Sequence, residues 1–214
     1  MKTILTIDSL IIQAAEFTEL EDVHNEPNLY GVTDGKAIGT YLEHKFKFHL
    51  TATYIYEPGN SASGIDFPGL SVDLKVTSFT QPQSSCPFKS ARQKIYGLGY
   101  HLLIFVYEKF DDHILKTGKL NMKSTIFVDK SRTADYQMTR GIIEILERDG
   151  NEDDLIAFLH DKNLPVDEIE ARNIAMEILQ NPPQIGYVTI SNALQWRLQY
   201  ARVIQKAGEI EGIY

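Results

Sequence analysis

The sequence predicts an α/β fold, with a mixed central sheet flanked by helices and a helical subdomain at the C-terminal end. Three features support this prediction. Apolar residues recur at helical spacing before residue 50, an almost unbroken apolar run from Tyr100 to Tyr107 is typical of a buried central strand, and helical spacing returns in the last third. We therefore expect a core over residues 1–135 and a helical subdomain over residues 136–214.

Length and composition limit the class of protein. The 214 residues suit one domain, or a core with a small subdomain, and 43% hydrophobic residues is ordinary for a globular protein. No apolar run approaches the roughly 20 residues that span a bilayer, and Asp8 interrupts the short apolar start, which argues against a signal peptide. Cys86 is the only cysteine, so an intramolecular disulfide and a thiolate-rich zinc site are excluded. We expect a cytoplasmic protein without a membrane segment.

Two helices and a strand are expected first. Apolar residues at helical spacing predict helices over residues 8–22 and 36–50, separated by a loop over 25–35 that is rich in Asn, Pro and Gly. Residues 51–56, Thr-Ala-Thr-Tyr-Ile-Tyr, are typical of a strand.

Residues 63–76, Ser-Gly-Ile-Asp-Phe-Pro-Gly-Leu-Ser-Val-Asp-Leu-Lys-Val, predict two short strands joined by a tight Pro-Gly turn. Side chains alternate along a strand. On the second strand, Val72 and its alternate neighbours should therefore point into the core, while Asp73 and Lys75 point together to the other face.

The first strand of this hairpin carries Asp66. Its neighbours Ile65 and Phe67 should point inward and Asp66 outward, and the turn then brings Asp66 back toward Asp73 and Lys75. Two carboxylates and an ammonium on a rigid platform can hold a hard divalent cation and orient a water molecule.

This pattern, an aspartate, six residues and Asp-x-Lys, resembles the active site of the PD-(D/E)xK nuclease superfamily, in particular the type II restriction endonucleases. By this resemblance Asp66 is the first acid, Asp73 the second and Lys75 the lysine. Glu43, on the predicted second helix, matches a glutamate that the family often adds. The chain departs from the pattern because Ile65, not proline, precedes the first acid, and because the short gap demands a tight hairpin. The resemblance covers roughly residues 35–130.

The resemblance implies a restriction-endonuclease-like fold and a Mg²⁺-dependent, sequence-specific hydrolysis of double-stranded DNA. Asp66 and Asp73 would bind one or two Mg²⁺ ions, with the Leu74 carbonyl oxygen as a further ligand. Lys75 would position the attacking water or help to deprotonate it. The products would carry 5′-phosphate and 3′-hydroxyl ends. Recognition of a palindrome would call for a homodimer, in which the helical subdomain would serve recognition or dimerisation.

The same residues have a non-catalytic interpretation. Asp66, Asp73 and Lys75 could form a surface salt bridge that contributes about 0–1 kcal/mol, and Glu43 could form an ordinary i,i+4 helix pair with Lys47. The hairpin adjoins a strongly apolar strand, however, so its outer face is expected to line a cleft. This expectation favours catalysis.

A polar loop over residues 78–87 and a helix over 88–96, which opens near Pro87, follow the Asp-x-Lys strand. A strand over 100–107 and another over 124–128 complete the predicted sheet. The loop and helix are either solvated surface or a DNA-binding segment, since Gln can read adenine and Arg can read guanine. The candidate DNA contacts here are Thr77, Gln81, Gln83, Ser84, Ser85, Lys89, Arg92 and Lys94.

The last third predicts helices over residues 133–148, 153–160 and 167–179, a break at Asn181-Pro182-Pro183, and a final helix over 191–207 that is capped by Ser191 or Thr189. The final helix either packs in the core or enters a DNA groove. Its candidate DNA contacts are Asn192, Gln195 and Arg197.

The net charge of −8 argues at first against a nucleic-acid binder, but the distribution of the charges weakens that objection. Residues 75–140 hold 11 Lys and Arg against 5 Asp and Glu, whereas residues 141–180 hold 3 against 11. A basic middle and an acidic flank fit a protein with one face for an anionic ligand; solvated charges of mixed sign are the alternative. Two other functions also remain open: a structure-specific repair or junction nuclease of the same fold, and a non-catalytic DNA-binding or protein-interaction module.

Overall fold

The computed structural model describes residues 2–59, 64–86, 89–191 and 196–214. The chain divides into two compact units. The first comprises residues 1–83, 101–128 and 214, and the second comprises residues 84–100 and 129–213. The boundary at residue 135 stays a prediction about domain organisation. Among the described residues, no helix is both long and apolar enough to cross a membrane.

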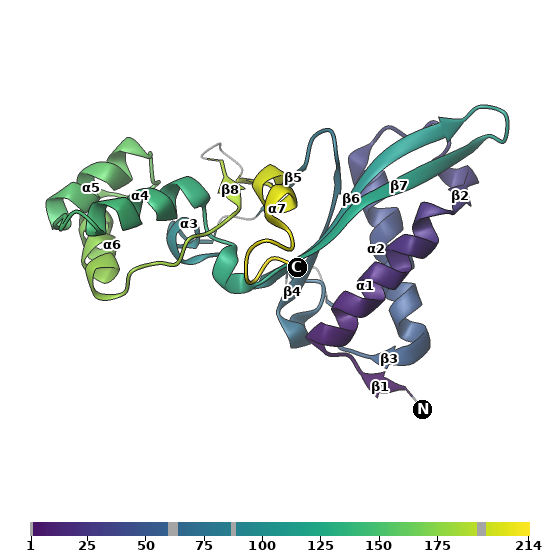
Figure 1. Ribbon diagram of the computed structural model, residues 1–214, viewed down its shortest axis with the longest axis horizontal. Coiled ribbons are helices and arrows are strands. Elements are labelled where there is room, and N and C mark those ends of the chain that lie inside the picture. Colours follow the sequence, from purple (N-terminus) through teal and green to yellow (C-terminus); the bar gives the residue numbers. More distant parts are fainter. Residues whose placement is uncertain (1, 60–63, 87–88, 192–195) are drawn as a thin grey trace. The chain divides into compact units, whose positions relative to one another are not determined.

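A four-stranded mixed sheet, in the order β2-β7-β6-β4, is the frame of the first unit (Figure 1). β6 runs antiparallel to β7 and parallel to β4, where Leu74 lies opposite Leu103. The sheet therefore confirms the expected mixed α/β class and leaves β4 at an edge. The strands are β2 (Asn25–Glu26), β4 (Val72–Ser78), β6 (His101–Asp112) and β7 (Thr117–Val128).

Two long helices, α1 (Ile7–Asp22) and α2 (Gly35–Thr53), cover the sheet: α1 packs against β7 and α2 against β4. The side chains of Thr6 and Asp34 cap their N-termini by accepting hydrogen bonds from first-turn amides. α2 continues to Thr53, so the strand expected over 51–56 is wrong for its first three residues. Only β3 (Tyr54–Ile55) remains, which pairs with β1 (Thr3–Ile4).

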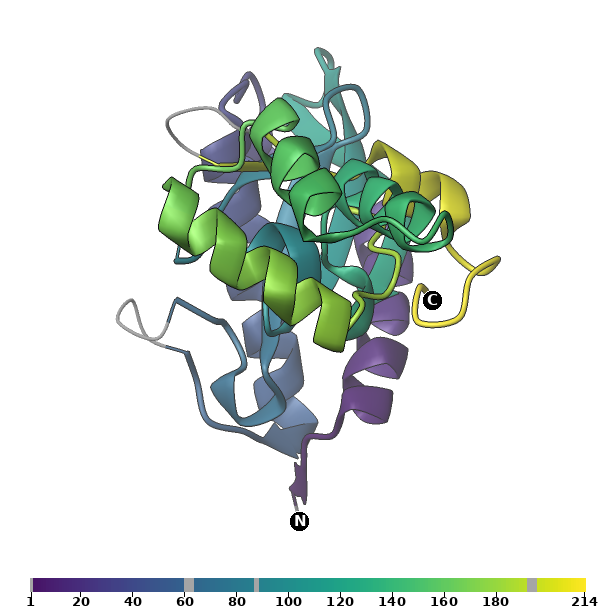
Figure 2. The ribbon, with the colours of Figure 1, turned by 90° about the vertical axis from the view of Figure 1, so that its left-hand side faces the viewer.

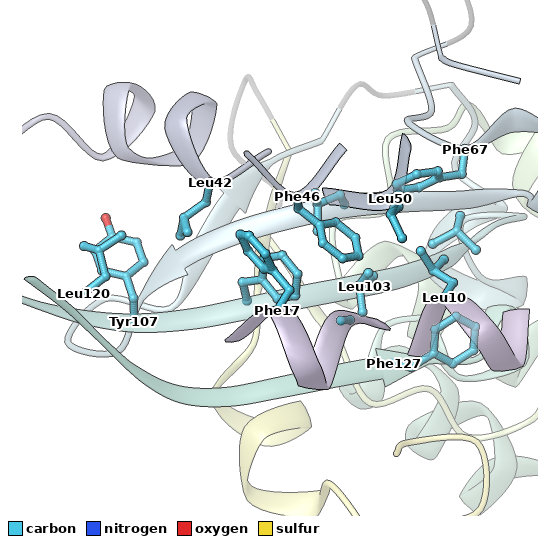
Figure 3. Close-up of a cluster of buried hydrophobic side chains, with 14 of the residues drawn as sticks. Leu10, Phe17, Leu42, Phe46, Leu50, Phe67, Leu103, Tyr107, Leu120 and Phe127 are labelled. Atoms are coloured by element: carbon cyan, nitrogen blue, oxygen red, sulfur yellow. The ribbon is translucent and has the colours of Figure 1, made fainter. Parts of the chain in front are cut away.

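The core of the first unit lies between these helices and the sheet (Figure 3). The ring centroid of Phe46 lies 5.1 Å from that of Phe17 and 5.2 Å from that of Phe105, and aromatic rings attract each other at such distances. Val72 and Leu74 are buried in this core, with Val76 packed against it, as the alternation along β4 predicts. The opposite face of β4 is thereby left for Asp73 and Lys75.

The second unit is mainly helical (Figure 2). α5 packs against both α4 and α6 around an apolar core that includes Ile142, Leu155 and Ile174. These three helices confirm the helical spacing of the region. Its helical elements are α3 (Gln93–Tyr96), η3 (Lys130–Arg132), α4 (Tyr136–Leu146), α5 (Glu152–Asp161), α6 (Glu168–Gln180) and α7 (Ala201–Lys206).

The helix expected over 191–207 is wrong for residues 197–199. These form a strand, β9 (Arg197–Gln199), that pairs antiparallel with β8 (Thr189–Ile190). Residues 192–195 lie outside the described residues, and within the described part of the range only α7 is helical. Thr189 therefore lies in a strand instead of capping a helix. Burial alternates along β9, with Leu198 buried between two exposed residues, and this period of two identifies a strand.

The segment expected as loop and helix over 78–96 also differs. β4 extends through Ser78, residues 83–85 form β5 (Gln83–Ser85), and helix α3 spans only Gln93–Tyr96. β5 joins β9 and β8 in a three-stranded sheet. Residues 87–88, where the expected helix begins, lie outside the described residues.

Candidate active site

The outer edge of β4 is completed by the segment that precedes it. Val72 exchanges two backbone hydrogen bonds with Phe67, of 3.2 and 2.9 Å, on the side away from β6. Backbone groups alternate in direction along a strand, so the N–H of Leu74 points to the same side, where it donates to Asp66 Oδ2 at 2.9 Å. The Asp66 carboxylate thus occupies the place of a neighbouring strand.

The turn between Asp66 and β4 differs from the expected Pro-Gly hairpin, because residues 68–71 separate the bridged pair Phe67 and Val72. Pro68–Leu70 form a 3₁₀ turn (η2), and Ser71 adopts a left-handed backbone conformation with φ of 53°. The first strand is reduced to the single bridge at Phe67, so the expectation of two strands is wrong there, because the 3₁₀ turn leaves no room for a longer ladder. The backbone of Asp66 is fixed by Gly59, whose N–H donates to the backbone carbonyl oxygen of Asp66 at 2.9 Å.

The turn brings the two predicted acids together. The Asp66 and Asp73 carboxyl groups are hydrogen-bonded to each other, and Asp73 is only 4% exposed. Burial raises the pKa of Asp73 to about 7; Lys75 opposes this shift, while Asp66 adds to it. Burial also acts to raise the pKa of Asp66, but hydrogen bonds from Asp73, Lys47 and the Leu74 N–H lower it overall.

Lys75 completes the predicted set. Its ammonium lies 2.7 Å from Asp73 Oδ2 on the face of β4 opposite the core. Asp66, Asp73 and Lys75, predicted to meet on one platform, are therefore together in the structure.

Glu43 reaches this group indirectly. Its Oε1 lies 2.6 Å from the ammonium of Lys47, one turn later on α2, and the same ammonium lies 2.7 Å from Asp66 Oδ1. Both the i,i+4 pair and a link to the acids are present. Burial lowers the pKa of Lys47, but its hydrogen bonds to Asp66 and Glu43 outweigh that effect and raise it overall. The sequence suggested Lys47 only as a helix partner of Glu43; its contact with Asp66 depends on packing and has no local signal.

The donor set suits a hard cation that keeps part of its water. Among the described residues, no group of three or more His, Cys, Asp or Glu side chains is arranged to hold a metal ion. Asp66 and Asp73 nevertheless present adjacent carboxyl groups whose mutual repulsion and burial a cation would relieve. The carbonyl of Leu74 points to the same side of β4 as its N–H, toward Asp66. One or two carboxylates with further oxygens is the usual protein environment of Mg²⁺, so these residues fit it.

Comparison with known proteins identifies the family. The family model described as type II restriction enzyme NspV matches residues 4–214. The chain is also 66% identical over 211 residues to the type II restriction enzyme NspV of Nostoc sp. (strain ATCC 29411 / PCC 7524). The aligned region covers 99% of this chain and 96% of that protein. The chain belongs to the NspV family of type II restriction enzymes. The expected restriction enzyme is thus confirmed. No solved structure matches the chain significantly.

Several of the DNA contacts predicted for this NspV-family member are buried or engaged within the protein. Thr77 is buried, and its Oγ1 accepts from the Gln83 N–H at 2.9 Å, which holds the loop after β4. Lys94 is also buried, and burial lowers its pKa. Arg92 forms ion pairs with Glu170 and Glu177 on α6. These placements favour structural roles for Thr77, Lys94 and Arg92.

Other predicted contacts of the NspV-family chain remain accessible. Gln81, Ser85, Lys89 and Arg197 are exposed, and Gln83 is half-buried. Ser84 is half-buried and hydrogen-bonds the hydroxyl of Tyr200. Asn192 and Gln195 lie outside the described residues.

Proposed function

We propose that this protein is a Mg²⁺-dependent endonuclease that hydrolyses phosphodiester bonds at a specific sequence in double-stranded DNA. The observation that carries the proposal is the hydrogen-bonded pair of Asp66 and Asp73 beside Lys75, on an edge strand of an NspV-family chain. A buried acid pair next to an ammonium is costly as a structural element, because burial opposes charge. Perturbed acids of this kind are typical of active sites.

The three side chains have distinct roles in this proposal. Asp66, Asp73 and the Leu74 carbonyl would hold Mg²⁺, which when bound supplies a water of lowered pKa and positive charge against the scissile phosphate. Asp73 gives up the proton of the acid pair as the site is loaded. The Lys75 ammonium, held by Asp73 at 2.7 Å, would orient the attacking water and stabilise negative charge that develops on the phosphate.

The proposed partners are double-stranded DNA and a second copy of the chain. We infer that the exposed polar residues after β4 and on β9 contact DNA, with the phosphates positioning the duplex and base edges specifying it. We also infer that the protein acts as a homodimer, because a two-fold dimer matches a palindromic DNA site. We place its activity in the cytoplasm. The candidates with accessible side chains are Gln81, Gln83, Ser85, Lys89 and Arg197.

The test is cleavage of a plasmid of known sequence, with the ends then sequenced. Discrete bands that need Mg²⁺ are expected from the wild type. Asp73→Ala and Lys75→Met should each lower the cleavage rate by at least about 100-fold with an unchanged circular-dichroism spectrum. Asp111→Ala is a matched control, because Asp111 pairs with Lys109 two residues away on neighbouring β6, and it should cut like the wild type.

Each alternative has its own outcome. A structure-specific nuclease of the same fold would cut branched DNA and leave a linear duplex intact or cut it without sequence preference. A non-catalytic DNA-binding module would cut nothing in Mg²⁺. Undiminished cleavage by Asp73→Ala would remove the proposed site even if the cutting is sequence-specific.

A further inference from the structure

Lys47 places a positive charge directly against the proposed metal ligands. Its ammonium bridges Glu43 Oε1 at 2.6 Å and Asp66 Oδ1 at 2.7 Å. The side chain is 22% exposed, so water screens these contacts only in part. A single ammonium thus bridges two carboxylates from separate segments, Glu43 on α2 and Asp66 before β4.

Both oxygens of the Asp66 carboxylate are occupied in this arrangement. Lys47 holds Oδ1, and the N–H of Leu74 holds Oδ2. The Leu74 contact is made by a strand backbone and is fixed. Asp73 also hydrogen-bonds Asp66, but it is itself a proposed metal ligand. The Lys47 contact is made by a flexible, positively charged side chain, so it is the one that a competing cation would displace.

We propose that Lys47 is a positioning residue that occupies the cation position beside Asp66 in the metal-free protein and must leave Asp66 when the divalent metal binds. The inference rests on the proposed function, since it takes Asp66 and Asp73 as metal ligands. Glu43, one helical turn from Lys47, retains the displaced ammonium near the site.

Two consequences follow from simple electrostatics. First, a cation that competes for Asp66 weakens divalent-metal binding to the DNA-free protein, because one ion pair must break before another forms. Second, the same cation keeps Asp66 and Glu43 from repelling each other when no metal is present. Loss of Lys47 should therefore strengthen metal binding and make the folded site depend on metal.

The experiment is calorimetric titration of Mn²⁺ into DNA-free protein at pH 7.5, with thermal melts in EDTA and in Mn²⁺. Lys47→Met keeps the length of the side chain and removes its charge. It should bind Mn²⁺ at least about 10-fold more tightly than the wild type, melt at a lower temperature in EDTA, and gain more from Mn²⁺. Lys47→Gln is a second variant in case the methionine variant does not fold.

Lys45→Met is the matched control. Lys45 lies two residues away on the same helix and forms a similar ion pair, 2.7 Å from the buried Glu21. If loss of any half-buried lysine on α2 produced the effect, Lys45→Met would show it as well. We expect the Mn²⁺ affinity of Lys45→Met to equal that of the wild type.

The outcomes separate this inference from the proposed function. Equal or weaker Mn²⁺ binding by Lys47→Met, together with lost binding by Asp73→Ala, overturns the role of Lys47 and leaves the metal site intact. Unchanged binding by Asp73→Ala overturns the metal site and the inference with it. A gain in affinity shared by Lys45→Met also overturns the inference, because the effect would then be one of general charge.

Discussion

Asp66 and Asp73 are hydrogen-bonded to each other through their carboxyl groups. Two carboxyl groups can share such a bond only when one of them carries a proton. We expect the proton on Asp73, because burial raises the pKa of Asp73 to about 7 while the pKa of Asp66 is lowered. The acid pair therefore loses one proton near neutral pH, and the behaviour of the site should depend on pH accordingly.

Asp73→Asn should remove one component of the pH dependence of stability. The folded protein binds the Asp73 proton more tightly than the unfolded chain, whose carboxyl has its ordinary pKa of 3.8. This stabilisation is complete below about pH 4 and is lost as the pH rises through about 7. From pH 6 to pH 8, metal-free wild type should therefore lose roughly 1 kcal/mol relative to Asp73→Asn.

Urea denaturation at pH 6, 7 and 8 in EDTA measures this difference. Asp66 does not interfere, because its pKa is lowered: its stabilisation is fully present at these pH values and is lost only as the pH falls below its ordinary pKa of 3.8. Parallel stability curves for the wild type and Asp73→Asn would contradict the assignment of the proton to Asp73.

Divalent metal should bind more tightly as the pH rises. In the proposed site, metal and proton would compete for Asp73, so metal binding would release the proton that the acid pair holds. With the pKa of Asp73 at about 7, Mg²⁺ affinity should rise about tenfold from pH 6 to pH 8 and level off above that. Calorimetry at pH 7 in two buffers of different ionisation enthalpy should show release of about half a proton per site. An affinity that is equal at pH 6 and pH 8 is the contrary result.

The side chains of the proposed site could be placed together from the sequence because their placement follows from local rules. Alternation along β4 places Asp73 and Lys75 on one face, and a turn at Pro68 returns Asp66 to them. The turn itself was harder to predict: a 3₁₀ turn with Ser71 in the left-handed region replaces the expected hairpin. The contact of Lys47 with Asp66 depends on how α2 packs on β4, which no local pattern specifies.

The wrong helix over 191–207 has a similar explanation. Trp196, Leu198 and Tyr200 alternate as in a strand, while Tyr200 and Val203 keep helical i,i+3 spacing, so over so short a stretch the pattern alone does not separate the two. The pairing of Ile190 with Leu198 decides in favour of a strand, and that pairing is a tertiary contact. The burial of the DNA candidates Lys94 and Thr77 was not predictable for the same reason, because charge and polarity do not reveal burial.

Gly59→Ala should impair the site from a distance. A Cβ at residue 59 would lie 2.1 Å from the Ile65 carbonyl oxygen and 2.7 Å from that of Asp66. These are backbone atoms, so the segment that carries Asp66 must shift. A displacement of about 1 Å in a catalytic group lowers rates about 100-fold, and we expect a loss of that order in Mg²⁺-dependent cleavage.

Gly69→Ala is the control for this substitution. Gly69 lies in the turn that follows Asp66, but a Cβ there would meet nothing within 4 Å. Its cleavage rate and melting temperature should stay close to those of the wild type. If both glycine variants lost activity equally, the steric explanation for Gly59 would fail.

Asp135→Ala should destabilise the second unit strongly. Asp135 is 4% exposed and serves two segments: Oδ1 accepts from the N–H of Met138 at the start of α4 at 2.8 Å, and Oδ2 accepts from the N–H of Ile190 in β8 at 2.7 Å. Its removal takes away a helix cap and leaves a buried N–H without its acceptor. We expect a loss of about 2–3 kcal/mol.

Asp167→Ala is the comparison for this loss. Asp167 also caps a helix, by accepting from the N–H of Glu170 on α6 at 2.8 Å, but that bond is exposed and joins no second segment. Its removal should cost about 1 kcal/mol. Trp196, the single tryptophan, is buried in the second unit, so its fluorescence during urea denaturation follows that unit. Equal losses in the two variants would mean that the link from Asp135 to β8 adds nothing to stability.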